Sequence, residues 1–159
     1  MSQFTSDLEI GRRGELIALE AFTKLYPHCK FKDVARDKAY YYVGDIEVEN
    51  TEKGTKAFIE VKNDSRIATT RNVLCEDEYF DKYNGEFYKG NMANVGTTFY
   101  CVVSEPERAI YILDYKELQK IYKQGEFKRI IHETQDTFAY LMPLSTLKRK
   151  GILLETINY

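Results

Sequence analysis

Cysteine is scarce in this sequence of 159 residues, which contains Cys29, Cys75 and Cys101 and no CxxC pair. An odd number of cysteines at such wide spacing argues against a disulfide framework and gives no sign of a cysteine-based zinc or redox site. We therefore expect the protein to reside in a reducing compartment, the cytoplasm.

Long apolar runs and a dominant charge of one sign are also absent. No eighteen successive residues are apolar, and the first residues do not combine a basic start with an apolar run. Lysine and arginine, 23 together, nearly balance aspartate and glutamate, 25 together, which leaves a formal net charge of -2. We expect no membrane span and no export, and any site for a polyanion must be local.

Common catalytic motifs are missing as well. The sequence has no G-x-x-x-x-G-K-[ST] phosphate loop, no G-x-S-x-G nucleophile elbow and no H-E-x-x-H pair. Its two histidines, His28 and His132, are isolated, so each is expected to be an ordinary surface or strand residue.

The periodicity of the chain predicts one α/β or α+β domain over residues 1–159, with a helix first and a mixed β-sheet in the middle. Helical spacing that stops at Pro27 predicts a helix over residues 6–26. The alternating runs DIEVEN and AFIEVKN around the turn TEKGTK predict a β-hairpin. Strands are further predicted for 29–43, 97–104, 109–115, 128–133 and 137–144, and helices for 115–124 and 145–151. No structure is predicted for residues 64–96.

Charged residues share one face of the predicted hairpin. Aligning the apolar faces of the two strands puts Glu47 across from Glu60 and Asp45 across from Lys62. Asp45 and Glu60 are then diagonal neighbours at roughly 7–8 Å, near enough for both carboxylates to bind one divalent cation. The alternative is an ordinary solvated face on which Lys62 neutralises Asp45.

Glu15 falls among apolar positions of the first helix that its spacing turns toward the core, with Leu8, Gly11, Ala18 and Phe22. A lone buried carboxylate costs several kcal/mol unless it is paired or bound to a metal ion. An ion pair with Arg12 or Lys62, or a rotation that exposes Glu15, would also satisfy this requirement. Gly11 and Gly14 would let the helix approach the sheet closely.

Over roughly its first sixty residues the sequence resembles the PD-(D/E)XK nuclease superfamily, which has the restriction-endonuclease-like fold and includes resolvase-like and phage-encoded members. The resemblance lies in RRGELIALEAF within the helix, GD before the first hairpin strand and EVK within the second. The motif residues of the superfamily fall on Asp45, Glu60 and Lys62, and Glu15 stands at the place of its helix glutamate. Gly44 replaces the proline that often precedes the aspartate.

This resemblance implies a central mixed sheet flanked by helices and a metal-dependent nuclease, acting on DNA rather than RNA. Asp45 and Glu60 would bind Mg²⁺ or Mn²⁺ with the carbonyl of Val61, and Lys62 would orient the attacking water. Glu15 would hold a metal-bound water or a second ion. Nearby donors are expected to hold the nucleic-acid backbone: Arg12, Arg13, Asn63, Ser65, Arg66, Thr69, Thr70 and Arg71.

Two other functions stay open at this point. The same fold can serve as a catalytically inactive protein that binds nucleic acid or another protein. A plain α+β interaction module with a solvated hairpin is the third interpretation. A homodimer is compatible with each of these.

Overall fold

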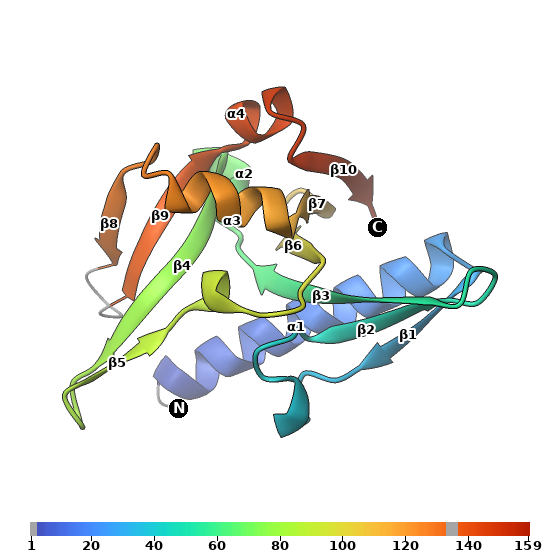
Figure 1. Ribbon diagram of the computed structural model, residues 1–159, viewed down its shortest axis with the longest axis horizontal. Helices are drawn as coiled ribbons and strands as arrows, with labels where there is room; N and C mark the ends of the chain where they lie inside the picture. Colours follow the sequence, from blue (N-terminus) through green and yellow to red (C-terminus); the bar gives the residue numbers. More distant parts are fainter. Residues whose placement is uncertain (1–2, 133–136) are drawn as a thin grey trace.

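A computed structural model describes residues 3–132 and 137–159 of the chain, which form two β-sheets and four α-helices (Figure 1). The chain begins with the long helix α1 (Gln3–Leu25). The first sheet has the strand order β1-β2-β3-β6-β7-β10. Its strands are β1 (Cys29–Asp33), β2 (Ile46–Asn50), β3 (Thr55–Asn63), β6 (Phe99–Ser104), β7 (Ala109–Asp114) and β10 (Leu153–Asn158).

The first sheet is mixed, because β3 and β6 run parallel while the other neighbouring strands are antiparallel. The second sheet is antiparallel, with the order β5-β4-β9-β8. Its strands are β4 (Asn72–Asp81), β5 (Glu86–Lys89), β8 (Arg129–His132) and β9 (Thr137–Pro143). The remaining elements are α2 (Ile67–Thr70), α3 (Tyr115–Lys123), α4 (Leu144–Arg149) and the 3-10 turns η1 (Lys38–Tyr40) and η2 (Asn91–Ala93).

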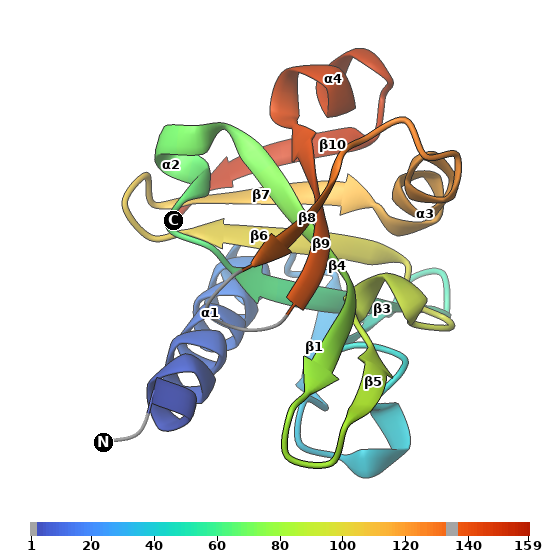
Figure 2. The ribbon, with the colours of Figure 1, turned by 90° about the vertical axis from the view of Figure 1, so that its left-hand side faces the viewer.

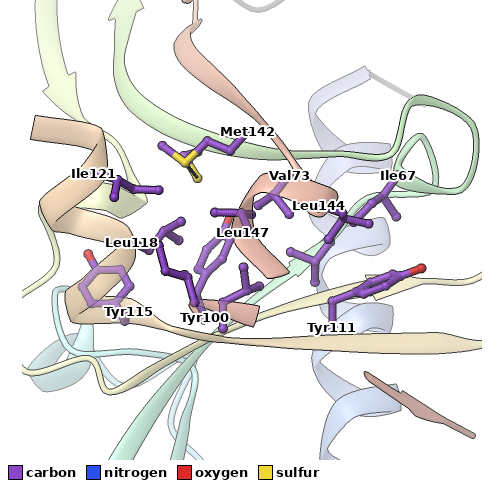
Figure 3. Close-up of a cluster of buried hydrophobic side chains, with 14 of the residues drawn as sticks. Ile67, Val73, Tyr100, Tyr111, Tyr115, Leu118, Ile121, Met142, Leu144 and Leu147 are labelled. Carbon is purple, nitrogen blue, oxygen red and sulfur yellow. Dashed lines mark hydrogen bonds between the residues drawn. The ribbon is translucent and has the colours of Figure 1, made fainter. Parts of the chain in front are cut away.

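The first sheet lies between α1 on one face and the second sheet with α3 and α4 on the other (Figures 1 and 2). The alternation of β6 produces this arrangement: Cys101 and Val103 pack toward α1, whereas Tyr100 and Val102 join the core under the second sheet. Figure 3 shows this second core, where Leu118 of α3 and Leu147 of α4 approach Tyr100. Within the described residues no helix is long and apolar enough to cross a membrane.

The structure confirms an α+β fold with the helix first and a central mixed sheet flanked by helices. The predicted strand 29–43 was too long, because Asp33 ends it by accepting a hydrogen bond from the Ala35 amide and residues 38–40 form a 3-10 turn. Residues 64–96, left unassigned, form β4 and β5 of a second sheet that the sequence did not predict. Strand β10 was also missed. The end of the predicted strand 128–133 lies outside the described residues.

The two glycines of α1 differ in what surrounds them. A Cβ atom on Gly14 would lie 2.6 Å from Asn63 Cβ, so this glycine lets the helix meet β3 closely, whereas a Cβ on Gly11 would have nothing within 4 Å. The prediction of a close approach is therefore confirmed at Gly14 and wrong at Gly11.

This difference predicts opposite effects of the same substitution in one helix. Gly14→Ala should lower the free energy of unfolding by about 1–3 kcal/mol through overpacking. Gly11→Ala should raise it by up to about 1 kcal/mol, because alanine loses less backbone entropy on helix formation. Urea denaturation of both variants measures the two effects, and a Gly14→Ala protein as stable as Gly11→Ala would contradict the packing.

Candidate active site

The β2–β3 hairpin pairs in a different register from the predicted one. Ile46 lies opposite Ile59 and Glu47 lies opposite Phe58, so Glu47 does not face Glu60. The predicted pairing was wrong by two positions, although both registers keep the apolar side chains on one face.

The turn between the strands explains the difference. The carbonyl of Asn50 accepts a hydrogen bond from the Gly54 amide at 2.8 Å, and its side-chain oxygen accepts two further amides of the turn at 3.1 and 3.0 Å. The turn is thereby closed over residues 51–54, and Thr55 already pairs with Asn50. The regular pairing ends at Ile46 and Ile59, because the Asp45 amide donates to the carbonyl of Ile59 as well. Asp45 is nevertheless close enough to Glu60 for the charge of one carboxylate to act on the other.

Gly44 positions Asp45 at the end of β2. It has φ of +148°, and a Cβ atom there would lie 2.8 Å from the carbonyl oxygen of Ile59, so only glycine fits without strain. The Asp45 amide donates to that same oxygen at 2.8 Å, and Asp45 Oδ2 accepts from the Val61 amide at 2.8 Å. Because the amide and carbonyl of one strand residue point to the same edge, the Val61 carbonyl also faces Asp45.

One cleft of about 330 Å³ brings the four residues of the sequence motif together. Glu15 reaches it from α1, Asp45 from the start of β2, and Glu60 and Lys62 from the end of β3, with Val61 also lining it. The side chain of Val61 itself packs toward α1, so Glu60 and Lys62 point to the opposite face, toward the second sheet. Their catalytic and metal-binding roles stay predictions.

Asp45 and Glu60 form a pair of adjacent carboxylates, and neither makes an ion pair within the described residues. Burial raises the pKa of Asp45 to about 7 against the effect of the Val61 hydrogen bond, and the charge of Glu15 adds to the rise. Burial and the neighbouring Asp45 hold the pKa of Glu60 well above its ordinary value, although Asn94 Nδ2 donates to Glu60 Oε2 at 2.8 Å. A cation between the two carboxylates would remove their repulsion.

Lys62 is held by a residue that the sequence did not single out. Its ammonium group pairs with Glu76 of β4, and the two side chains are 30% and 22% exposed. The Glu76 amide donates to Asn91 Oδ1 at 3.1 Å, and Asn91 Nδ2 donates to the Tyr100 hydroxyl at 3.0 Å, so Glu76 sits on a fixed framework. The short apolar run VLC, residues 73–75 directly before Glu76, was the one sequence signal of a strand here that could have located this glutamate.

Glu15 combines a structural ion pair with a place in the cleft. Its carboxylate accepts from Arg12 at 2.7 Å, and Arg12 also pairs with Asp33 of β1. The Arg12 guanidinium lowers the pKa of Asp33. The ion pair between Glu15 and Arg12, one of the alternatives given by the sequence, is therefore present. Glu15 also lines the cleft with Asp45.

Three of the predicted backbone-binding residues lie beside the cleft. Arg66 and Asn63 line it, and Ser65 between them is exposed. The Asn63 amide group is engaged inside the protein, because Nδ2 donates to the carbonyl of Ile10 at 2.9 Å and to Glu105 Oε1 at 2.7 Å. Asn63 therefore ties α1 to β3 at the point where the cleft begins.

The other predicted backbone-binding residues bind neighbouring protein groups. Besides Arg12, Arg13 pairs with Glu105 at 2.8 Å and Arg71 pairs with Glu107 at 2.6 Å. The hydroxyls of Thr69 and Thr70 donate to the Arg66 carbonyl, at 3.2 and 2.9 Å. A nucleic-acid phosphate would have to compete with these contacts, and the roles of these residues stay predictions.

The oxygen groups around Asp45 fit a hard divalent cation. Two carboxylates, Asp45 and Glu60, and the carbonyl of Val61 are the ligand types that Mg²⁺ and Mn²⁺ prefer. Within the described residues no three histidine, cysteine, aspartate or glutamate side chains gather closely enough to hold an ion by themselves. Such an ion would therefore keep several waters, which is the usual state of protein-bound Mg²⁺.

Comparisons with known proteins add little information about function to the geometry of the cleft. No protein-family model matches the sequence, and no curated protein matches it. Among solved structures, the chain is similar to D212, a nuclease from a fusselovirus, with a TM-score of 0.43 and 13% sequence identity over 91% of this chain and 86% of that one. A likeness of this size carries no functional information, so the function of the chain has to be inferred from the residues of the cleft.

Proposed function

We propose that this protein is a metal-dependent nuclease that hydrolyses phosphodiester bonds, with DNA as its substrate in preference to RNA. The observation that carries the proposal is the pair of adjacent, desolvated carboxylates of Asp45 and Glu60, neither of which forms an ion pair within the described residues. Such a pair either takes up protons, as the raised pKa values indicate, or binds a cation that relieves the repulsion between its members. The resemblance of the sequence to PD-(D/E)XK nucleases supports the same function, and DNA as the substrate rests on that resemblance alone.

Asp45, Glu60 and the Val61 carbonyl would hold Mg²⁺ or Mn²⁺ in this proposal. When bound, a hard divalent ion lowers the pKa of water and neutralises charge that develops on the phosphate. Lys62 is placed to orient the attacking water and to bind a phosphate oxygen once the substrate displaces its contact with Glu76. Glu15, held by Arg12, adds a negative charge near Asp45 and would hold a metal-bound water or a second ion.

The test is cleavage of labelled oligonucleotides by the purified protein. Single-stranded, duplex and branched DNA and single-stranded RNA should each be incubated with Mg²⁺, with Mn²⁺ and with EDTA. We expect cleavage of at least one DNA in either metal, slower cleavage of RNA, and none in EDTA. Cleavage that persists in EDTA, or no cleavage of any substrate in either metal, would contradict the proposal.

A catalytically inactive nucleic-acid-binding protein is the second candidate, and the Lys62–Glu76 ion pair favours it, because this contact neutralises the ammonium group in the described conformation. The same oligonucleotides distinguish the two candidates. Binding without cleavage in Mg²⁺ and Mn²⁺ would indicate the inactive protein. The homodimer and the cytoplasmic location expected from the sequence stay predictions.

A further inference from the structure

A second hollow lies next to the cleft, between the end of β5 and one face of α3. It has a volume of about 430 Å³, and the segment around η2 forms one wall. Gln119 of α3 holds this wall in place, because its side-chain amide donates to the carbonyls of Met92 at 2.8 Å and Asn94 at 3.3 Å. The Tyr115 hydroxyl adds a hydrogen bond of 2.6 Å to the carbonyl of Asn91. The hollow is therefore built by defined contacts between α3 and the η2 segment.

The residues of this hollow carry only positive charge. Lys89 comes from β5, and Lys116 and Lys123 come from one face of α3, since residues seven apart in a helix lie on the same side. No aspartate or glutamate among the described residues lines the hollow, and none of the three lysines forms an ion pair within that part of the chain. The nearby acids of α3 are occupied, because Asp114 caps the helix and Glu117 pairs with Lys120 at 2.5 Å.

The cleft, in contrast to the hollow, is lined mainly by negatively charged residues. Asp7, Glu15, Asp45, Glu60 and Glu76 line it, against Lys62 and Arg66. A polyanion whose scissile phosphate enters this cleft meets mostly carboxylates, and the protein as a whole has a formal net charge of -2. Affinity for nucleic acid has to come from a local group of basic residues that no carboxylate already neutralises.

Asn94 connects the two places. It is 7% exposed, it lines the basic hollow, and its Nδ2 donates to Glu60 Oε2 at 2.8 Å. A single residue thus separates a carboxylate of the cleft from the wall that faces Lys89, Lys116 and Lys123. The basic hollow and the cleft are therefore neighbouring places in the fold, with Asn94 between them.

We infer that Lys89, Lys116 and Lys123 bind phosphates of the substrate strand, on the side of Asn94 away from the cleft. The inference rests on the proposed function and adds to it the surface that supplies affinity. Lysine ammonium groups on flexible stems bind phosphates as point charges without reading base sequence. The hollow therefore holds the nucleic-acid backbone irrespective of sequence, while the cleft carries the chemistry.

The test is a triple variant, Lys89→Ala, Lys116→Ala and Lys123→Ala, compared with a control triple variant, Lys30→Ala, Lys53→Ala and Lys148→Ala. The three control lysines are exposed and line neither the cleft nor the hollow, so both proteins lose the same charge. Binding of fluorescent single-stranded and duplex DNA is measured by anisotropy in EDTA over a series of salt concentrations. KM for cleavage is then measured in Mn²⁺.

We expect the hollow variant to bind DNA about 10- to 100-fold more weakly than the wild type near 0.1 M salt, and its slope of log K against log salt to fall by about 2 to 3. KM should rise correspondingly, while the control variant changes each quantity less than about threefold. Equal weakening in the two variants, or unchanged affinity in the hollow variant of a protein that cleaves DNA, would overturn the lysine site and leave the nuclease standing. A wild-type protein that neither binds nor cleaves DNA would overturn both.

Discussion

Asp45→Asn is expected to reduce the rate of metal-dependent DNA cleavage by about 10³-fold or more, because it removes a charged ligand from the proposed ion site. Asparagine keeps an oxygen that can accept the Val61 amide, so the end of β2 should keep its position. Lys62→Ala should reduce cleavage by a similar factor for a different reason, since it removes the ammonium group that would face the water and the phosphate. Single-turnover cleavage in Mn²⁺ measures both losses.

Metal binding separates the two variants. Calorimetric titration with Mn²⁺ should show weaker binding in Asp45→Asn, whereas Lys62→Ala should bind the ion as well as the wild type or more tightly, because a positive charge beside the ion is gone. Lys56→Ala is the matched control, since Lys56 lies on the same face of β3 and also pairs with a glutamate, Glu47, at 3.0 Å. Its cleavage rate should stay near that of the wild type. Full activity in Lys62→Ala would contradict the catalytic assignment.

The second large effect is on the pH dependence of stability without metal. The pKa of Asp45 is about 7 in the folded protein, against an ordinary value near 3.8, so the folded state binds more protons than the unfolded state between these pH values. Stability must then fall as pH rises through this window. Relative to Asp45→Asn, the wild type should lose on the order of 3 kcal/mol between pH 4 and pH 7, and the difference should level off above pH 8.

Urea denaturation of the two proteins in EDTA across this pH range measures that difference, and comparison with the variant removes the contributions of carboxylates elsewhere. Mn²⁺ at a hundredfold excess over its Kd should then add about 2.7 kcal/mol to the wild type at pH 8 and much less to Asp45→Asn. Loss of the Asp45 charge also removes its repulsion of the Glu60 carboxylate. This effect likewise stabilises the variant relative to the wild type at high pH. A pH-independent difference between the proteins would show that Asp45 is not a desolvated, unpaired carboxylate.

Part of the site follows from local sequence. Period-two alternation in residues 45–50 and 57–63 puts Asp45, Glu60 and Lys62 on one strand face whichever register forms, because both registers keep apolar residues together. The existence of α1 likewise follows from helical spacing, although the helix begins at Gln3, three residues before the predicted start, and ends at Leu25. These are properties of a few residues at a time, and a side-chain pattern is enough to predict them.

Other features depend on contacts between distant segments. The register of the hairpin was set by the hydrogen bonds of Asn50 in the turn and by the close contact of Gly44 with Ile59, neither of which alternation reveals. Glu76 was missed because only the three apolar residues before it signal a strand, while the rest of β4 is mostly polar and is defined by its pairing with β9, far along the chain. The pairing of strands distant in sequence depends on the whole fold, and short windows of sequence do not carry it.

The sequence alone therefore determined a helix-first α+β fold and the three charged residues of a hairpin face, since both rest on local periodicity. Only the tertiary structure decided that Asp45 lies near Glu60 with no ion pair to either among the described residues, that Lys62 is held by Glu76, and that three lysines gather beyond Asn94. The physical reason is that burial and ion pairing are properties of the folded surroundings. Whether a charged side chain is desolvated, paired or free to bind a ligand depends on how the second sheet and α3 pack against the first sheet.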